Sequence, residues 1–143
     1  MSNADELTLR AMRAAASPAL QKLWPDGESP RSWQGVKWSG DRVQELNLIG
    51  SELEVLPPEI GQLKVLTELC LTRCPLKQLP PEIGQLLALT NLYLGGCPLK
   101  ELPPEFGQLT ALTELGLRGC EQLTLAPGAE EGQPAQTIVA AYA

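Results

Sequence analysis

The sequence repeats itself with a period of 23 residues, and this periodicity limits the possible folds more than any other feature. The octet LPPEIGQL at residues 56–63 recurs unchanged at residues 79–86, and LPPEFGQL follows at residues 102–109. The unit at 56–78 and the unit at 79–101 are identical at 16 of 23 positions. One short unit cannot enclose its own apolar side chains, so tandem units must stack on one another. The chain is therefore expected to form a solenoid.

Leucines alternate with other residues inside each unit, as in LTNLYL at residues 89–94. A period of two is typical of a β-strand with one buried face. Each unit is therefore expected to contribute one strand, which pairs in parallel with the strands of its neighbours. The leucines expected to face the core are Leu46 and Leu48, Leu69 and Leu71, Leu92 and Leu94, and Leu115 and Leu117.

The repeated octet is interpreted as scaffold. Leu56, Ile60 and Leu63 are spaced to point inward from the outer side of the coil. The pair Pro57-Pro58 fixes φ at the start of a short 3₁₀ or helical turn, and Gly61 is expected to help end that turn. The alternative is a proline-rich docking motif, which requires an extended polyproline backbone.

The segments at residues 43–53, 66–76, 89–99 and 112–120 align on the pattern LxxLxLxxCxL. In this pattern the chain resembles leucine-rich repeat proteins over residues 43–125. The resemblance implies an α/β fold, a short horseshoe-shaped solenoid with one parallel strand per repeat and short 3₁₀ or helical turns on its convex side. The LPxxIGxL form with a cysteine in the turn resembles intracellular arrays of ROCO-type GTPases and nucleotide-binding receptors.

Three regions are expected along the chain: a helical and hairpin N-terminal cap at 1–42, four repeats at 43–125, and a linker with a partial cap at 126–143. The first region reads as two short helices, with Leu7, Met12 and Ala15 at near-helical spacing. Ser17-Pro18 is expected to supply the N-cap and first residue of the second helix. The apolar run at 137–143 either covers the last coil or begins an element that the chain does not contain, as in a fragment of a longer protein.

The segment SWQGVKWSGDRVQELNL at residues 32–48 resembles the N-terminal cap of plant-type leucine-rich repeat proteins, in which a hairpin leads into the first strand. Where those caps carry a cysteine pair, this sequence has Arg31 and Trp38, which favours a reducing compartment and a cytoplasmic location. Trp24, Trp33 and Trp38 are expected to form the core of the cap, with Trp38 filling the space of the missing clamp. An aromatic binding platform is the alternative.

Cys74, Cys97 and Cys120 recur at intervals of 23 residues, at a position where the family usually carries Asn or Cys. They are expected to form a buried row of reduced thiols that cap turn carbonyls with their S–H donors. Cys70 is expected on the exposed side of its strand. A zinc site requires a close ligand pair and further ligands, and the sequence has no CxxC pair and no histidine. No metal and no cofactor are therefore expected.

Composition excludes several classes of function. The net charge of −6 gives no electrostatic support for nucleic-acid binding. No apolar run is long enough to cross a bilayer, so no membrane partner is expected. The absence of histidine removes the commonest general base and triad partner, and phosphate-loop and kinase motifs are missing. The chain is therefore not expected to be an enzyme. It is expected to bind a protein ligand as a monomer or weak homodimer, as the recognition domain of a larger signalling or immune-receptor protein.

Two alternatives remain open at this point. The array could be the substrate-recognition arm of a GTPase, kinase or ubiquitin ligase whose catalytic domain lies outside these residues. It could also be a self-assembling structural repeat, in which the edge of the last coil pairs with a second copy.

The repeats differ mainly on the exposed strand face, which is expected to be concave. Four of the seven differences between the units at 56–78 and 79–101 fall there. This pattern favours a surface adapted to recognition, although chance or an ordinary solvated sheet face would also explain it. Exposed Tyr and Arg are typical of protein interfaces. The candidate partner-binding residues are Glu45, Asn47, Glu68, Cys70, Thr72, Arg73, Asn91, Tyr93, Glu114 and Arg118.

Overall fold

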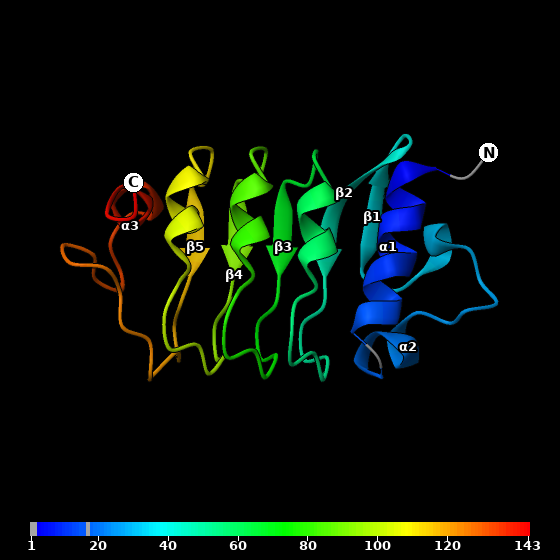
Figure 1. The fold of residues 1–143 in the computed structure, drawn as a ribbon, viewed down its shortest axis with the longest axis horizontal. Helices are drawn as coiled ribbons and strands as arrows, with labels where there is room; N and C mark the ends of the chain where they lie inside the picture. The colour runs from blue at the N-terminus through cyan, green and yellow to red at the C-terminus, as the bar shows by residue number, and fades with distance from the viewer. Residues whose placement is uncertain (1–2, 17) are drawn as a thin grey trace.

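The computed structural model describes residues 3–16 and 18–143, and within them five strands form one sheet in the order β1–β2–β3–β4–β5 (Figure 1). Strands β2 to β5 pair in parallel and β1 pairs with β2 as an antiparallel hairpin, so the expected strand of each repeat is confirmed. The domain boundaries stay a prediction. The strands are β1 Val36–Ser39, β2 Arg42–Asn47, β3 Glu68–Cys70, β4 Asn91–Tyr93 and β5 Glu114–Gly116.

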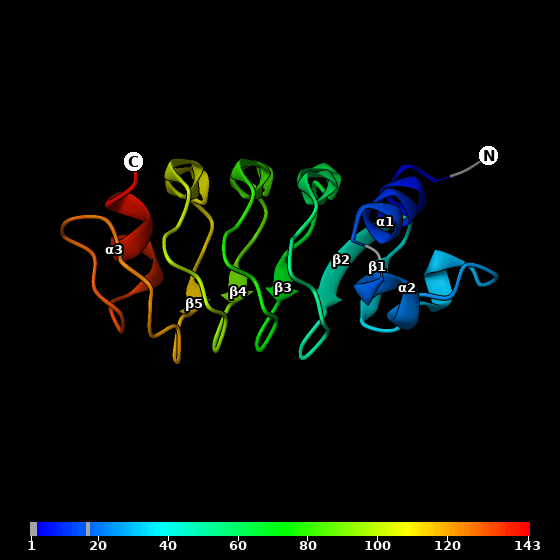
Figure 2. The same ribbon diagram turned by 60° about the horizontal axis from the view of Figure 1, so that its bottom comes forward.

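Short 3₁₀ helices stack on the side of the coils opposite the strands (Figure 2). They are η2 Pro58–Gln62, η3 Pro81–Gln85 and η4 Pro104–Gln108. Each begins at the second proline of its octet, because a residue followed by proline is disfavoured in the helical region, and Pro57 is extended with ψ near 146°. The apolar residues Leu56, Ile60 and Leu63 are fully buried, so the octet is scaffold, as its spacing indicated.

The interpretation of Gly61 as a turn-ending residue is wrong, because Gly61 lies inside η2. A β-carbon at Gly61 would lie 2.7 Å from Gln85 Oε1 and 3.0 Å from the backbone oxygen of Glu82. At Gly84 it would lie 2.5 Å from the backbone oxygen of Glu105. Glycine is required here because the outer turns of neighbouring coils approach each other too closely for any side chain.

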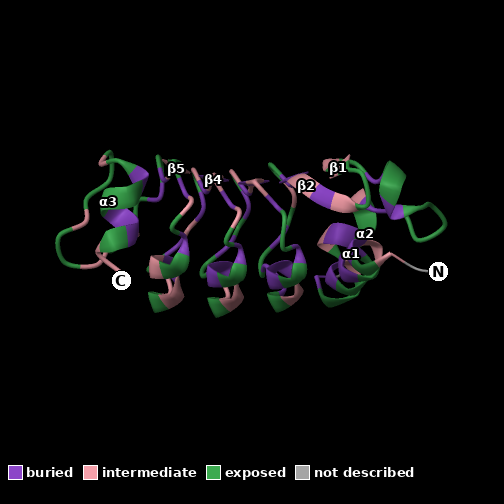
Figure 3. Ribbon diagram, turned by 90° about the horizontal axis from the view of Figure 1, so that it is seen from above, coloured by how far each residue is buried: buried purple, intermediate pink, exposed green. Residues whose placement is uncertain are grey.

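The core lies between the strands and the 3₁₀ helices. Figure 3 shows buried residues on the sides of strands and turns that face each other, and exposed residues on the far sides of the turns. The expected inward leucines are buried, with one exception: Leu115 on β5 is only half-buried, because no further strand packs beside it. Each buried leucine contributes about 1.5–3 kcal/mol to the stability of the stack.

The N-terminal cap contains α1 Ala4–Ala15, α2 Ala19–Leu23 and the short η1 Pro30–Ser32, and α1 packs against η2. Of the three apolar residues at near-helical spacing, only Met12 is buried, since Leu7 is 55% exposed and Ala15 is exposed. The buried carboxylate of Asp5 sets the orientation of α1 by accepting hydrogen bonds from Arg42 Nε (3.0 Å) and Val43 N (2.8 Å). The buried face is formed by Asp5, Thr8, Leu9 and Met12.

The two expected helices are present, but the start of α2 differs from expectation. Pro18 is the N-cap of α2 rather than its first helical residue, and it makes no side-chain capping bond. Ser17, the expected N-cap, lies outside the described residues.

Two of the three tryptophans form the core of the cap. Trp24 and Trp33 are buried and stack with their ring centroids 5.1 Å apart, which confirms the cap-core interpretation for this pair. Trp38 does not belong to the buried core of the cap, as was expected of all three tryptophans, but packs against its edge at the position of the missing cysteine pair. Trp38 is half-buried at the surface, and the guanidinium of Arg31 lies 4.4 Å from the centre of its ring. A cation–π contact therefore joins the two positions where related caps carry cysteines.

The C-terminal segment covers the last coil. Helix α3 Ala135–Ala140 packs against η4 with Ile138 and Val139 buried, and the ring of Tyr142 meets the edge of Phe106. Gln136 donates hydrogen bonds from its side-chain amide to the carbonyls of Thr110 and Leu112, which no further coil would otherwise satisfy. Residues of the apolar run at 137–143 thus pack against the last coil, and the assignment of 126–143 as a linker with a partial cap stays a prediction.

The expected thiol row is also confirmed. Cys74, Cys97 and Cys120 are buried, and their thiols donate to the carbonyls of residues 48, 71 and 94 at 3.0–3.1 Å. Burial raises the pKa of Cys97 to about 11, which keeps the thiol protonated as the donor. All four cysteines are unpaired. Within residues 3–16 and 18–143, no group of three or more potential metal ligands is found, and no helix is long and apolar enough to span a bilayer.

Candidate functional site

The outward surface of β2 to β5, which we call the sheet face, presents three rows of side chains that run across the strands. Strand pairing places the members of the first two rows in direct register, and backbone hydrogen bonds beyond the strands continue the alignment to the third. The first row, called the acidic row, is Glu45, Glu68, Asn91 and Glu114. The middle row is Asn47, Cys70, Tyr93 and Gly116, and the end row is Ile49, Thr72, Gly95 and Arg118.

The acidic row concentrates negative charge. Glu45 forms an ion pair with Lys37 of β1 at 3.0 Å, whereas Glu68 makes no ion pair within the described part of the chain. Desolvation raises the pKa of Glu68, and the charge and hydrogen bonding of Glu45 and the charge of Glu114 raise it further against the opposing effect of Lys37. Glu68 therefore lies close enough to the carboxylates of Glu45 and Glu114 for their charges to disfavour its ionisation.

Tyr93 is held in place by its neighbours on the sheet face. The side-chain amide of Asn91 donates to Tyr93 Oη at 2.9 Å and to Glu114 Oε2 at 2.9 Å. The Tyr93 hydroxyl donates to the same carboxylate, and this hydrogen bond is the largest cause that raises the pKa of Tyr93. These bonds fix the aromatic ring across β4 and β5, so the ring is presented in one orientation.

The glycines of the sheet face do not leave open space for a partner at every position. A β-carbon at Gly116 would lie 3.2 Å from Tyr93 Cδ1, so the ring of Tyr93 already occupies the space above Gly116. A β-carbon at Gly95 would lie 3.1 Å from the backbone oxygen of Arg118. These glycines are therefore needed for contacts inside the protein.

The positive charges of the sheet face lie at the end row and just beyond it. Arg73 follows Thr72, and both Arg73 and Arg118 are exposed. Neither guanidinium forms an ion pair with any residue among 3–16 and 18–143. The sheet face thus carries negative charge on one side and positive charge on the other, with Tyr93 and Cys70 between them.

The structure brings the ten candidate residues onto one surface. Seven of them lie on strands β2 to β5. The other three follow within three residues of the ends of β3 and β5, and they are Thr72, Arg73 and Arg118. Whether these residues bind a partner stays a prediction. Sequence reasoning missed the hydrogen-bonded cluster of Asn91, Tyr93 and Glu114, because residues 21 and 23 apart meet only when adjacent coils are aligned.

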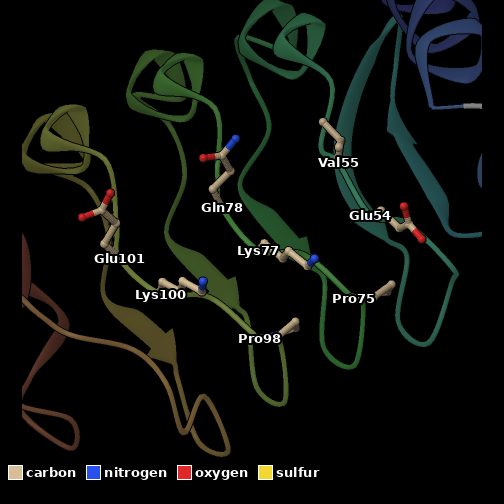
Figure 4. Close-up of a pocket in the computed structure, with 8 residues that line it drawn as sticks. All are labelled: Glu54, Val55, Pro75, Lys77, Gln78, Pro98, Lys100 and Glu101. Carbon is tan, nitrogen blue, oxygen red and sulfur yellow. The ribbon is translucent and has the colours of Figure 1, made fainter.

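A groove of about 560 Å³ lies on a different surface, along the segments that lead from the strands to the outer turns (Figure 4). Lys77 and Lys100 lie along it from adjacent coils, and Glu54 and Glu101 also line it. The charges of this groove are mixed in sign, and its remaining residues are Val55, Gln78 and two prolines.

Comparison with known proteins identifies the repeats. A family model described as Leucine Rich Repeat matches residues 88–109, and no curated protein matches the chain. A plant ice-binding protein is similar over 81% of this chain and 40% of its own, with 30% identity and a TM-score of 0.69. A leucine-rich repeat protein of Leptospira interrogans is 41% identical over 59% of this chain and 25% of its own, with a TM-score of 0.52.

The fold is shared more widely. The BIR2 ectodomain of Arabidopsis thaliana, at 22% identity, covers 81% of this chain and 68% of its own with a TM-score of 0.67. This chain spans 40% and 25% of the lengths of the ice-binding and Leptospira proteins. The stacked parallel strands and the 3₁₀ turns agree with the family match and with these structures. The chain has the leucine-rich repeat solenoid fold, and residues 88–109 match the Leucine Rich Repeat family.

Proposed function

We propose that this chain is a protein-binding module that holds a protein ligand on its sheet face and performs no catalytic chemistry itself. One observation carries the proposal. All seven positions that differ between the units at 56–78 and 79–101 are exposed or half-buried, and four of them lie on or at the end of the sheet face. Variation in the side chains presented by a constant scaffold is what a surface adapted to one ligand requires.

The chemistry of the sheet face supports this proposal. Tyrosine and arginine supply large contact areas and directional hydrogen bonds, and they are enriched among the residues that dominate binding energy. Tyr93 is fixed by Asn91 and Glu114 before any ligand arrives, so its ring loses little conformational freedom on binding. Fixed and exposed side chains of both charges favour a specific protein ligand over a nonspecific one.

A peptide selection tests the proposal without knowledge of the ligand. A phage library of random dodecapeptides is selected on the wild-type chain and then compared on two variants. In the sheet-face variant, Tyr93→Ala/Arg118→Ala, we expect the selected peptides to be lost. In the control variant, Lys77→Ala/Lys100→Ala, which alters the mixed-charge groove, we expect them to be retained. Selected peptides that bind the sheet-face variant as well as the wild type would exclude the sheet face as the binding site.

We further propose that the protein works in the reducing environment of the cytoplasm, as the recognition part of a larger signalling or immune-receptor protein. The four unpaired cysteines and the Arg31–Trp38 contact in place of a cap disulfide support this location. The 23-residue repeat form supports the larger context. Fractionation of cells that produce the protein, with an antibody against this region, tests the location; recovery only from the secreted fraction would contradict it.

A second candidate function is binding to ice. It is favoured by the 30% identity with a plant ice-binding protein and by the identical outer turns of successive coils, since a periodic surface can match a crystal lattice. The test is inhibition of ice recrystallisation by the purified chain, with an equal mass of an unrelated protein as control. Ice crystals that coarsen at the same rate in both samples would eliminate this candidate.

A further inference from the structure

One backbone position has the same left-handed conformation in all four coils. Residues 50, 73, 96 and 119 are spaced by 23 and have φ between +63° and +85°. Three of them are glycine, whereas the second coil has Arg73 at φ +63°. Arg73 is the one residue other than glycine with positive φ among residues 3–16 and 18–143. A residue with a β-carbon is strained in this region, and glycine is not.

No contact inside the described chain compensates for this strain. The Arg73 guanidinium makes no hydrogen bond and no ion pair with residues 3–16 or 18–143, and the side chain is exposed. Its nearest identified neighbour in the next coil is Gly96, where a β-carbon would lie 3.6 Å from Arg73 Cγ. A strained residue without an internal partner indicates that its side chain serves a purpose outside the protein's own stability.

The surroundings of Arg73 suit a carboxylate. Gly95 and Gly96 occupy the next coil without side chains, and Arg118 follows in the coil after that, aligned with Gly95 and Gly96 through backbone hydrogen bonds. Two exposed guanidinium groups therefore flank a stretch of bare backbone. A guanidinium binds a carboxylate through two parallel hydrogen bonds, and the geometry of this pairing gives specificity as well as affinity.

The acidic row defines where such a carboxylate can lie. Glu45, Glu68 and Glu114 stand on the other side of the middle row and would repel an acidic side chain placed over them. They would attract a basic one, which is also favoured by the net charge of −6. Charge complementarity across the sheet face thus calls for a ligand segment that carries a basic residue at the acidic row and an acidic residue at the end row.

We propose that Arg73 is a specificity-determining residue of the sheet face, kept in a strained backbone conformation so that its guanidinium binds an Asp or Glu side chain of the protein ligand. The inference rests on the proposed binding function. The mixed-charge groove with Lys77 and Lys100 is the weaker candidate for this role, since Glu54 and Glu101 line it and neither lysine has a left-handed backbone.

The first part of the test needs no ligand. Arg73→Gly removes the strain, so the equilibrium constant for unfolding is expected to fall about two- to tenfold, after allowance for the greater freedom of glycine in the unfolded chain. Arg73→Lys keeps the β-carbon and the charge, so its stability should match that of the wild type. Urea unfolding measures both variants. An Arg73→Gly variant no more stable than the wild type would overturn the inference.

The second part uses the dodecapeptides selected on the sheet face. They are expected to contain an Asp or Glu, and its replacement by Asn or Gln should weaken binding to the wild type about tenfold, as loss of a charge-assisted hydrogen bond does. The same replacement should have little effect on binding to Arg73→Gly, because the two groups act as a pair. Lys100→Gly serves as the charge-matched control and should behave as the wild type. Binding is measured by fluorescence anisotropy of labelled synthetic peptides.

The outcomes separate this inference from the function on which it rests. Replacing the Asp or Glu of a selected peptide could weaken its binding to the wild type and to Arg73→Gly by the same factor, while binding still requires Tyr93 and Arg118. This result would overturn the role of Arg73 and leave the binding function intact. A selection that yields no peptide dependent on the sheet face would overturn the binding function, and the role of Arg73 with it.

Discussion

The outer turns and the sheet face belong to the same coils, yet their exposed residues differ in how much they vary from one repeat to the next. The outer turns at 81–85 and 58–62 have identical residues, and the turn at 104–108 differs from them only at Phe106. On the sheet face, residues 68, 70, 72 and 73 differ from their counterparts 23 positions later. Several constant residues of the outer turns, including Gln62 and Gln85, are as exposed as those that vary.

Contact between coils explains this difference better than exposure does. In the outer turns Gly61 and Gly84 lie against the next turn with no room for a β-carbon, and Gln85 accepts a hydrogen bond from Lys64 Nζ of the preceding coil. A change in one outer turn therefore disturbs its neighbour. On the sheet face of the second coil, Glu68, Cys70 and Thr72 make no side-chain hydrogen bond to the next coil among the described residues, and these positions differ between coils. Constancy of the exposed residues in the outer turns at 58–62 and 81–85 therefore reflects packing between coils, whereas the sheet face is the surface on which the coils differ.

The largest expected effect is on the free energy of unfolding, when adjacent residues of strand β4 are replaced in turn. Leu92→Ala removes a fully buried side chain and is expected to lower the free energy of unfolding by about 2–5 kcal/mol. Asn91→Ala, on the sheet-face side of the same strand, should cost about 0.5–1.5 kcal/mol, the usual contribution of a hydrogen bond. Urea unfolding measures both. Equal losses would show that the two sides of β4 do not differ as described.

The next largest effect concerns the glycines of the outer turns. Gly84→Ala places a β-carbon 2.5 Å from the Glu105 backbone oxygen and is expected to cost about 1–3 kcal/mol, as overpacking does. Gly27→Ala is the matched control, since no atom lies within 4 Å of its β-carbon and its φ is not positive, and it should be neutral or slightly stabilising. Thermal unfolding of the two variants decides the point: a tolerated alanine at Gly84 would contradict close stacking as the reason for constancy.

A smaller effect is expected for the cysteines, which are compared in the buried row, at Cys97, and on the sheet face, at Cys70. Cys97→Ala removes one of the two hydrogen bonds that the Leu71 carbonyl accepts, the other coming from Cys74 N, and should cost about 1 kcal/mol, the usual contribution of a hydrogen bond. With a pKa of about 11, the Cys97 thiol is ionised in about one molecule in a thousand at pH 8. Cys70 is only half-buried on the sheet face. Alkylation at pH 8 followed by mass spectrometry should modify Cys70 first; early modification of Cys97 would speak against a buried thiol row.

The smallest effect comes from charge on the acidic row. The pKa of Glu68 is raised above its usual value of 4.5, so the folded protein disfavours the carboxylate, and this cost is present at neutral pH and disappears as the pH falls through the raised pKa toward 4.5. Glu68→Gln is therefore expected to stabilise the protein at pH 7 by at most about 0.5 kcal/mol, the scale of like-charge pairs on neighbouring strands. Glu45, Glu114 and Lys37 are the charged groups involved.

The measurement is the difference in unfolding midpoint between wild type and Glu68→Gln at pH 7 and again at pH 4. The stabilisation should be present at pH 7 and absent at pH 4. Glu82→Gln, on an outer turn, is the control and should change the midpoint little at either pH. Destabilisation of Glu68→Gln at pH 7 would indicate that Glu68 has a favourable partner instead of like-charged neighbours.

Much of the scaffold could be predicted because each coil repeats the same local information. The period of 23 indicated the number of residues per coil, the alternation of leucines indicated the strands, and the recurring cysteines indicated one buried row. Residues at the ends of the stack were predicted less well. Near-helical spacing grouped Leu7 with Met12, but the hydrogen bonds that Asp5 accepts from Arg42 and Val43 orient α1 so that Met12 is buried and Leu7 is exposed.

The candidate site was predicted as a set of residues but not as an arrangement. Ten positions on one side of four strands followed from the period of two and the alignment of repeats. The bonds that join Asn91 and Tyr93 to Glu114, and the left-handed backbone of Arg73, did not follow from any spacing. Comparison of Arg73 with the glycines at the corresponding positions was available in the sequence and is the signal that would have found it.

The sequence by itself determined that this chain is a stacked coil with buried leucines and thiols, because apolar periodicity is a property of each unit and is read without knowledge of the others. Only the tertiary structure decided what each glycine is for, how Arg31 and Trp38 meet, and where the ring of Tyr93 lies. These features depend on distances of a few ångströms between residues of different coils or of different segments of the cap. The spacing of residues along the chain does not predict such distances.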